Sequence, residues 1–260
     1  MNMKKKINMT VGRFQPFTKG HLNMVNEGEA PCVVYQIAPP SMPDSIDKFK
    51  VKGKKVKKQQ IENVLKFLNG EDVKLTEDEK EICKRPFTNE LVSKELDIVK
   101  RNNKLIFDIV YVKNLFDAIG QFNKFCTDNK DKYEPQYLMC GDDRVDEYAK
   151  LIDKYDELAI SIGSTETLPN ILKGKLKTNV GKGRTEGLSG TAVRASIINN
   201  DKQGFERQMP NGVGVMFNDF VNAFHTFADK LQGLIKECRV SLIEYIKESL
   251  EKWNHWNHTY

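Results

Sequence analysis

The sequence lacks the features that mark several large classes of protein. It has no run of 18 apolar residues, so we expect no membrane-spanning helix. The short apolar stretch after the basic N-terminus is interrupted by polar residues, which argues against a signal peptide. The five cysteines are odd in number and form no Cys-x-x-Cys pair, so we expect free thiols in a reducing compartment and no zinc site. We therefore expect a cytoplasmic protein without a membrane partner.

The sequence also has little excess charge of either sign. Its 41 lysine and arginine residues nearly balance 36 acidic residues, which gives a net charge of +5 over 260 residues. An excess of this size suits small anionic ligands such as nucleotides, and it is too small to make nucleic acid an expected partner. With 30% charged and 39% apolar residues, the composition is typical of a soluble protein. The length of 260 residues predicts one large or two small domains.

What the sequence does contain is an alternation of strand-like and helix-like segments. Short apolar runs separated by segments of helical periodicity are typical of a parallel α/β sheet. We therefore predict a Rossmann-like fold, with helices on both faces of a parallel sheet and ligands bound beyond the carboxyl ends of its strands. The predicted strands are 7–12, 32–38, 104–112, 137–141 and 157–164, and the predicted helices include 19–27, 114–126 and 144–155.

A charged insertion interrupts this pattern at residues 41–84. It has seven lysines between Lys48 and Lys58, followed by six acidic residues between Glu71 and Glu81. The alternation of lysine with other residues over 48–54 favours a solvated hairpin or loop. The two blocks of opposite charge could pair with each other or stay solvated. The alternative is a contact between the lysines and phosphate or nucleic acid.

The end of the chain is predicted to be a helical extension. Four phenylalanines recur there at helical spacing, which favours a face packed against the sheet; a partner helix in a homo-oligomer is the alternative. We therefore divide the chain into a domain of residues 1–212, which includes the insertion, and an extension of residues 213–260. The four phenylalanines are Phe217, Phe220, Phe224 and Phe227.

The segment VGRFQPFTKGH, residues 11–21, follows the first predicted strand. Gly12 ends the strand and lets a ligand approach the backbone, and Thr18 is a good N-cap for the helix that follows. The unpaired N–H groups and the dipole of a helix N-terminus attract anions, and Arg13 and His21 would add donors around them. The segment therefore predicts a phosphate site. An ordinary turn with a capping Thr18 and a solvated His21 is the alternative.

A second segment, LSGTAVR at residues 188–194, also has the pattern of a helix start. Ser189 or Thr191 can cap the helix, and Arg194 follows about one turn later on the same side. Capping alone is the alternative for this segment. The glycine- and lysine-rich stretch 177–187 before it is predicted to be a loop that closes over phosphates.

The first segment resembles the signature of the HxGH nucleotidylyltransferase superfamily, and SGTAVR resembles the partner motif near the end of the sheet in that superfamily. The GRFQPF opening is most similar to the archaeal-type nicotinamide-mononucleotide adenylyltransferases. Thr18 stands where those enzymes have histidine, and it resembles the TxGH variant of other branches, such as phosphopantetheine adenylyltransferase. CGDDR at 140–144 resembles a nucleotide-binding turn of these enzymes, with Asp142 toward the ribose; an Asx turn that caps a helix is the alternative.

The resemblance implies an enzyme that joins a nucleoside triphosphate to a phosphorylated acceptor and releases pyrophosphate. It favours the synthesis of NAD from nicotinamide mononucleotide and ATP, with Mg²⁺ carried by the triphosphate and no protein metal site. The residues to which it assigns roles are, for catalysis, His21, Arg194 and Thr18; for binding nucleotide or phosphate, Gly12, Arg13, Phe14, Lys19, Gly20, Asp142, Ser189, Gly190 and Thr191; and for binding the acceptor, Arg85, Asn89 and Phe116.

Two other functions fit the same sequence. The base and the acceptor are selected by backbone contacts that a sequence motif does not reveal. A cytidylyltransferase or another adenylyltransferase of the superfamily is therefore the first alternative. The second is a non-catalytic protein that binds nucleotides or supports an assembly on the same scaffold. The long insertion and the helical tail favour this second alternative, whereas the intact motifs argue against it.

Overall fold

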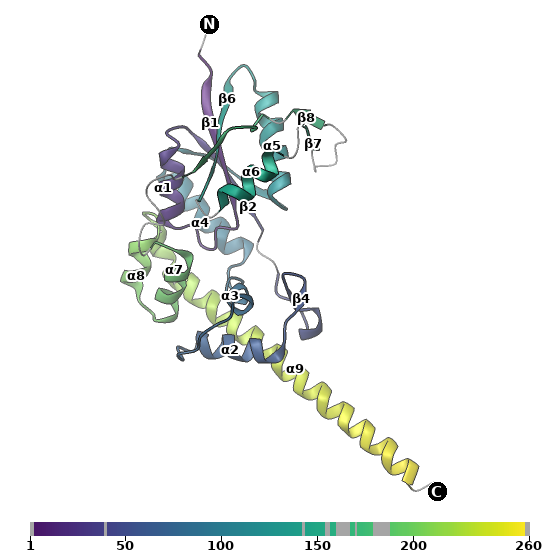
Figure 1. Ribbon diagram of the computed structural model, residues 1–260. Helices are drawn as coiled ribbons and strands as arrows, with labels where there is room; N and C mark the ends of the chain where they lie inside the picture. The colour runs from purple at the N-terminus through teal and green to yellow at the C-terminus, as the bar shows by residue number, and fades with distance from the viewer. Residues whose placement is uncertain are drawn as a thin grey trace. The chain divides into compact units, whose positions relative to one another are not determined.

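The computed structural model describes residues 3–38, 41–141, 144–153, 157–159, 167–169, 171–178 and 188–257. The chain divides into two compact units (Figure 1). The first unit comprises residues 1–39 and 89–219, and the second comprises residues 40–88 and 220–260. Each unit therefore combines two segments that lie far apart in the sequence.

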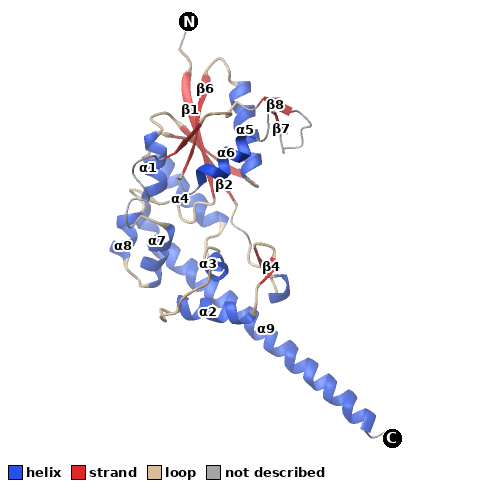
Figure 2. Ribbon diagram, viewed as in Figure 1, coloured by secondary structure: helices blue, strands red, loops and turns tan. Residues whose placement is uncertain are grey.

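The first unit alternates strands and helices (Figure 2). Its described strands are β1 (Lys5–Gly12), β2 (Cys32–Ile37), β5 (Ile106–Val112), β6 (Tyr133–Cys140), β7 (Glu157–Ala159), β8 (Thr167–Pro169) and β9 (Leu176–Thr178). Its described helices are α1 (Lys19–Glu27), α4 (Asn89–Asn102), α5 (Leu115–Asp128), α6 (Val145–Asp153), α7 (Gly190–Ile198) and α8 (Lys202–Gln208), followed by a short 3₁₀ helix (Val213–Met216).

Five strands of the first unit form one parallel sheet in the order β5-β2-β1-β6-β9. From β1 the chain moves through β2 to β5 on one side, and then returns to β6 and β9 on the other side. The strand order therefore reverses between β1 and β6. In open sheets of this kind, ligands bind in the crevice beyond the carboxyl ends of the strands at such a reversal.

Helices cover both faces of this sheet, as predicted. Alternate residues of β1 point to opposite faces, and the residues of each face contact a different helix. Ile7 and Met9 are fully buried and belong to a hydrophobic core that includes Phe122 of α5. Asn8, which lies between them, points to the other face, where its Nδ2 donates to the carbonyl oxygen of Gly28 at the end of α1 (3.1 Å). The predicted Rossmann-like α/β fold is thus confirmed.

The prediction of the fifth strand was wrong in its position. Residues 157–159 form β7, which pairs antiparallel with β8 in a separate two-stranded sheet, while residues 160–166 lie outside the described part of the chain. The fifth strand of the main sheet is β9, and its last two residues lie in the stretch predicted to be a loop. A strand of three residues at the sheet edge is too short to produce a period-two pattern, so the apolar run nearby was the stronger signal.

The second unit is built from the insertion and the C-terminal helix. Its described elements are a 3₁₀ helix (Ile46–Lys48), β3 (Lys50–Val51), β4 (Lys54–Lys55), α2 (Lys58–Leu68), α3 (Glu77–Ile82) and most of α9 (Phe217–Asn257). Phe49, Ile61 and Ile82 of the insertion share a core with Phe227 and Leu231 of α9. The predicted division assigned the insertion to the first domain and α9 to a separate extension. In the structure these two segments bury each other's apolar faces and form one unit.

The four phenylalanines at the start of α9 are buried, as expected from their spacing. Phe217 packs on Phe205 within the first unit, with ring centroids 5.3 Å apart. In the second unit, where we expected a sheet, Phe220 and Phe224 meet Phe87 with centroid distances of 5.2 and 5.5 Å. Among the described residues, no helix combines the length and apolar character needed to cross a bilayer.

Candidate functional site

The loop between β1 and α1, residues 13–18, leaves the sheet at the carboxyl end of β1. This strand borders β6, where the strand order reverses. The loop is tied to the neighbouring strand, because Nε2 of the fully buried Gln36 donates to the carbonyl oxygen of Arg13 (2.7 Å). The first sequence motif therefore lies at the place where a fold of this class is expected to bind its ligand.

His21 is held by the residue that begins its own helix. The backbone N–H of Thr18 donates to Nδ1 of His21 (2.9 Å), and Oγ1 of Thr18 lies 3.1 Å from the same nitrogen. Because Nδ1 accepts a hydrogen bond, the proton of the neutral imidazole is on Nε2. His21 is thus a hydrogen-bond donor through Nε2, on a ring whose orientation is fixed.

Phe14 supports this imidazole and takes a role different from the nucleotide contact that the resemblance implies. Its side chain is 6% exposed, and its ring packs on Phe17 and on His21, with centroid distances of 5.0 and 5.1 Å. A Cβ at position 12 would lie 3.0 Å from the Phe14 ring, so Gly12 leaves room for that ring. In the described arrangement, both residues shape the loop.

The second motif reaches this loop through Arg194. Ser189 caps α7, its Oγ accepting the N–H of Ala192 (3.1 Å). Arg194 then donates from Nη2 to Oγ1 of Thr191 (3.1 Å) and from Nη1 to the carbonyl oxygen of Gln15 (3.1 Å). The hydrogen bond to Gln15 joins residues 179 positions apart, so the second motif contacts the loop that contains the first.

Gly190 allows the start of α7 to lie close to the β1–α1 loop. A Cβ at Gly190 would lie 3.3 Å from the carbonyl oxygen of Gln15, which is a tight contact, whereas a Cβ at Gly20 would lie 3.5 Å from that of Leu188, at ordinary contact distance. Neither helix has an acidic residue in its first turn. Two helix N-termini without acidic side chains attract an anion by their N–H groups and their dipoles. His21 adds a side-chain donor to the first turn of α1, and Arg194 adds the guanidinium of α7 that contacts the β1–α1 loop.

Two buried amide atoms near this loop have no hydrogen-bond partner among the described residues. They are Nε2 of Gln15, a donor, and Oε1 of Gln36, an acceptor. Unpaired buried polar atoms cost free energy, so their presence around the loop favours a site that gains partners when a ligand binds. Sequence reasoning missed Gln36, although it is the one polar amide in the buried strand CVVYQI.

Glu95 is the other residue at this loop that sequence reasoning missed. It lies on the buried face of α4 beside Val92 and Leu96, and its Oε1 accepts the backbone N–H of Phe17 (2.9 Å). Its Oε2 is buried without a partner among the described residues. Burial raises the pKa of the carboxyl well above its usual value, and the hydrogen bond from Phe17 opposes burial only in part. An acidic residue at an apolar position of a helix was the signal.

We expect the protein to become less stable as the pH rises from about 4.3, the pKa of an unfolded glutamate, towards the raised pKa of folded Glu95. In that range the folded state binds its proton more tightly than the unfolded chain, so removal of protons favours unfolding. Glu95→Gln keeps an oxygen for the Phe17 N–H and removes the titration. Its Tm should exceed that of the wild type by a margin that grows with pH, as measured by thermal denaturation between about pH 5 and pH 8.

Glu79 provides a control of opposite sign for this experiment. Burial raises its pKa, but hydrogen bonds from Thr76 and Asn63 outweigh burial, and the net pKa is lowered. Its contribution to stability is therefore present at neutral pH and lost as the pH falls. Glu79→Gln should lower Tm most at neutral pH. If the Tm curves of Glu95→Gln and the wild type run parallel, Glu95 does not titrate in this range.

Other residues to which the resemblance assigns roles make different contacts from those of His21 and Arg194, or lie elsewhere in the structure. Nζ of Lys19 donates to the carbonyl oxygens of Glu206 (3.2 Å) and Arg207 (2.8 Å) at the end of α8. Asn89 is the exposed first residue of α4, and Phe116, 41% exposed, lies near the start of α5 beyond β5, two strands from β1. The further residues are Arg13, which is exposed; Arg85, which belongs to the second unit; and Asp142, which lies outside the described residues.

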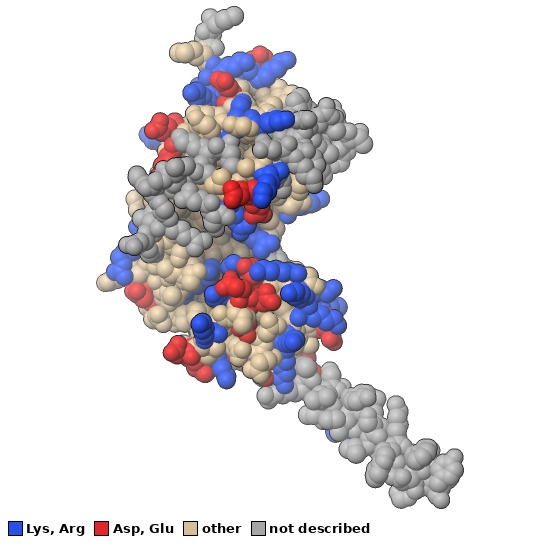
Figure 3. All heavy atoms as spheres, in the orientation of Figure 1, with Lys and Arg blue, Asp and Glu red and all other residues tan. Residues whose placement is uncertain are grey.

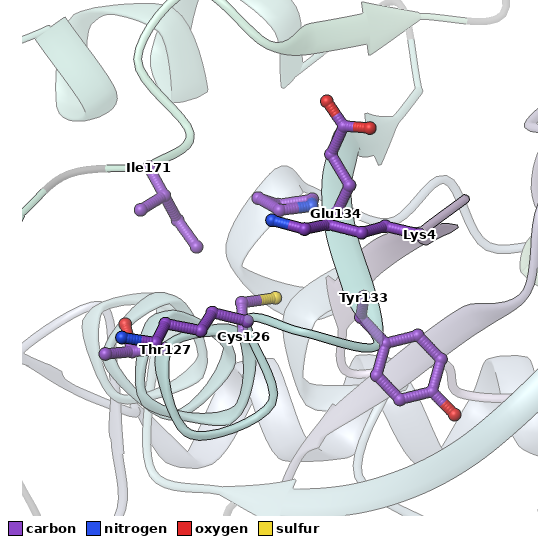
Figure 4. A pocket seen from close by; sticks show the side chains of 8 residues that line it. Lys4, Cys126, Thr127, Tyr133, Glu134 and Ile171 are labelled. Atoms are coloured by element: carbon purple, nitrogen blue, oxygen red, sulfur yellow. The ribbon is translucent and has the colours of Figure 1, made fainter. Parts of the chain in front are cut away.

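A cavity of about 530 Å³ lies at the end of the sheet opposite to the motifs, as its lining residues show. Figure 4 shows the side chains that line it. It is formed near the start of β1, the start of β6 and the end of α5, whereas the motifs lie at the carboxyl ends of the strands. Burial raises the pKa of Cys126 in its wall to about 12, which makes that thiol a poor nucleophile. We therefore place the candidate site at the two motifs. The residues that line the cavity are Lys4, Cys126, Thr127, Lys130, Tyr133, Glu134, Pro135 and Ile171.

The described residues contain no group of three or more histidine, cysteine or acidic side chains that could hold a metal ion. Comparison of the sequence with models of known protein families gives no match, and comparison with curated proteins gives none. The function of the site must therefore be argued from its own geometry: two helix N-termini, an oriented imidazole and a guanidinium at the reversal of a parallel sheet.

Proposed function

We propose that this protein is a nucleotidylyltransferase of the HxGH type, which joins a nucleoside triphosphate to a phosphorylated acceptor. The observation that carries the proposal is the hydrogen bond from Arg194 to the carbonyl oxygen of Gln15. It brings the second motif onto the loop of the first, which supports one site that includes His21 and Arg194. Donors from both motifs converge where an anionic ligand is expected, which supports a polyphosphate as that ligand.

The reaction needs positioning and charge stabilisation more than a strong base. An oxygen of the acceptor's phosphate attacks the α-phosphorus of the triphosphate in line, the new P–O bond forms, and the bond to the leaving pyrophosphate breaks. His21 through Nε2 and Arg194 through its guanidinium would donate to the triphosphate oxygens on which negative charge grows. The N–H groups at the starts of α1 and α7 would hold the same phosphates. Mg²⁺ would be carried by the triphosphate.

Nicotinamide mononucleotide and ATP are the substrates that we favour, with NAD and pyrophosphate as products. The support is the resemblance of the GRFQPF segment to the archaeal-type nicotinamide-mononucleotide adenylyltransferases. Thr18 supports a second candidate, another adenylyltransferase or a cytidylyltransferase. Its backbone N–H and its hydroxyl are both within hydrogen-bond distance of Nδ1 of His21. In this chain the threonine of the TxGH variant therefore orients the imidazole.

The proposed function is tested by pyrophosphate release with ATP and with CTP, each offered with a panel of phosphorylated acceptors and Mg²⁺. We expect release with ATP and nicotinamide mononucleotide, together with formation of NAD. Release only with another pair would keep the nucleotidylyltransferase and change its substrate. Binding of ATP without release for any pair would assign the protein to the non-catalytic nucleotide-binding class.

A further inference from the structure

The lysine-rich part of the insertion, which we call the lysine hairpin (residues 48–58), is built around the two-stranded ribbon of β3 and β4. It carries seven lysines and no acidic residue. Six of the seven are exposed, whereas Phe49, Val51 and Val56 between them are buried in the core of the second unit. The hairpin thus fixes its apolar side chains inside the unit and presents its lysines outward (Figure 3).

The lysines of the hairpin are not neutralised by the acidic block that follows them in the sequence. In α3 and just after it, Glu77 pairs with Lys80 (2.6 Å), and Glu81 pairs with Lys84. The pKa of Glu77 is lowered chiefly by its hydrogen bond to Lys80, with a smaller contribution from Lys52. Within the described part of the insertion, no carboxylate forms an ion pair with the six exposed lysines. The two charged blocks therefore do not cancel.

Lysine is an unfavourable residue for the stability of the hairpin at several of the positions where it occurs. Lys50 and Lys55 stand directly opposite each other in the ribbon, and like charges in that position are destabilising. Lys52 occupies the first turn position with φ of +49° and is followed by Gly53 at +80°, where asparagine, aspartate or glycine is the favoured choice. Lysine at these positions opposes the stability of the hairpin, which indicates that its charge serves a contact with a partner.

The chemistry of the ribbon favours duplex DNA as that partner. Its apolar residues are buried, so it exposes no side chain to insert into a bilayer and no aromatic ring on which single-stranded bases could stack. Double-stranded DNA carries one negative charge for about every 1.7 Å of its axis, so its backbone presents several phosphates to a compact group of lysines. Lysine binds phosphate as a point charge and does not by itself read bases.

We propose that the lysine hairpin binds the phosphate backbone of double-stranded DNA without sequence preference. Arg85 holds the backbone of the hairpin in place. Its Nη2 donates to the carbonyl oxygen of Lys50 (2.7 Å), and its guanidinium lies 4.9 Å from the centroid of the Phe49 ring. This binding goes beyond the proposed enzymatic function and does not depend on it. A small net charge for the whole chain is compatible with it, because the positive charge is concentrated in eleven consecutive residues, 48–58.

The test is fluorescence anisotropy of the full chain with a short labelled DNA duplex at salt concentrations from about 50 to about 200 mM. The variant Lys50→Gln/Lys54→Gln/Lys55→Gln should bind at least about 10-fold more weakly than the wild type. Its slope of log K against log salt should be shallower by about 2 to 3, because each lost phosphate contact contributes about 0.9. Its Tm should equal or exceed that of the wild type, since the opposed pair Lys50 and Lys55 is removed.

Two matched variants separate a specific surface from bulk charge and from misfolding. Lys104→Gln/Lys130→Gln/Lys132→Gln removes the same charge from exposed positions of the first unit and should bind like the wild type. Lys50→Arg/Lys54→Arg/Lys55→Arg keeps the charge and should retain binding. The proposal is overturned if both glutamine variants lose affinity equally or if the wild type does not bind the duplex. It is also overturned if the hairpin binds phosphatidylserine vesicles in preference to the duplex.

Discussion

Replacing His21 by asparagine should lower kcat by about 100-fold or more while leaving the protein folded. The side-chain oxygen of asparagine can take the place of Nδ1, which accepts the N–H of Thr18 (2.9 Å). Asparagine has no donor at the position of Nε2, the atom that we assign to the triphosphate. The substitution therefore keeps the local structure at the start of α1 and removes only the proposed contact with the transition state. Pyrophosphate release under saturating substrates measures the effect.

Two further substitutions make this result specific. His21→Ala should lose kcat to the same extent and should also lower stability by about 1 kcal/mol, because the Thr18 N–H then loses its partner. His225→Ala removes an exposed histidine of α9 and should behave as the wild type. If His21→Asn keeps kcat within about threefold of the wild type, His21 only completes the helix start and does not act in the reaction.

Much of the first unit was predictable because its signals are local. The helix predicted over 19–27 coincides with α1, and the strand predicted over 32–38 is β2 with one residue less. Each follows from periodicity and from a turn at its end. The second unit was not predictable in the same way. It depends on contacts such as that between Phe87 and Phe220. The sequence shows that such segments have apolar faces, but it does not show which distant segment each face packs against.

The candidate site divides along the same line. His21 and Ser189 stand at helix starts, and Arg194 follows Ser189 by about one turn, so the local sequence pattern was enough to single out these residues. Glu95 was missed because its contact with Phe17 joins residues 78 positions apart. Lys19 was assigned to phosphate from its position in the motif, but α8 supplies the carbonyl oxygens to which its Nζ donates. A motif predicts which residues begin an element, whereas the direction of a long side chain depends on what packs beside it.

Replacing Arg194 by alanine should lower kcat/KM by about 100-fold to 1,000-fold, because the guanidinium donates to charge that grows in the transition state. The loss should exceed that from Arg194→Lys, which keeps the positive charge but has a point charge in place of a planar fork of donors. The fork matters here because its two Nη atoms already donate to different acceptors, the carbonyl oxygen of Gln15 and Oγ1 of Thr191. Lysine cannot reproduce both contacts and also face a phosphate.

These hydrogen bonds mean that Arg194 also joins α7 to the β1–α1 loop, so its structural and chemical roles must be separated. Added guanidine should restore part of the turnover of Arg194→Ala, since a free guanidinium supplies the missing donors without rejoining the two segments. Arg207→Ala is the control, because that guanidinium lies 3.8 Å from Asp201 on the exposed surface of α8 and its loss should leave kcat/KM unchanged. A variant Arg194→Ala that loses Tm, keeps kcat/KM within about threefold per folded molecule and ignores guanidine would reduce Arg194 to a structural link. The convergence of the two motifs would then describe how the fold is held together and not how it handles phosphate.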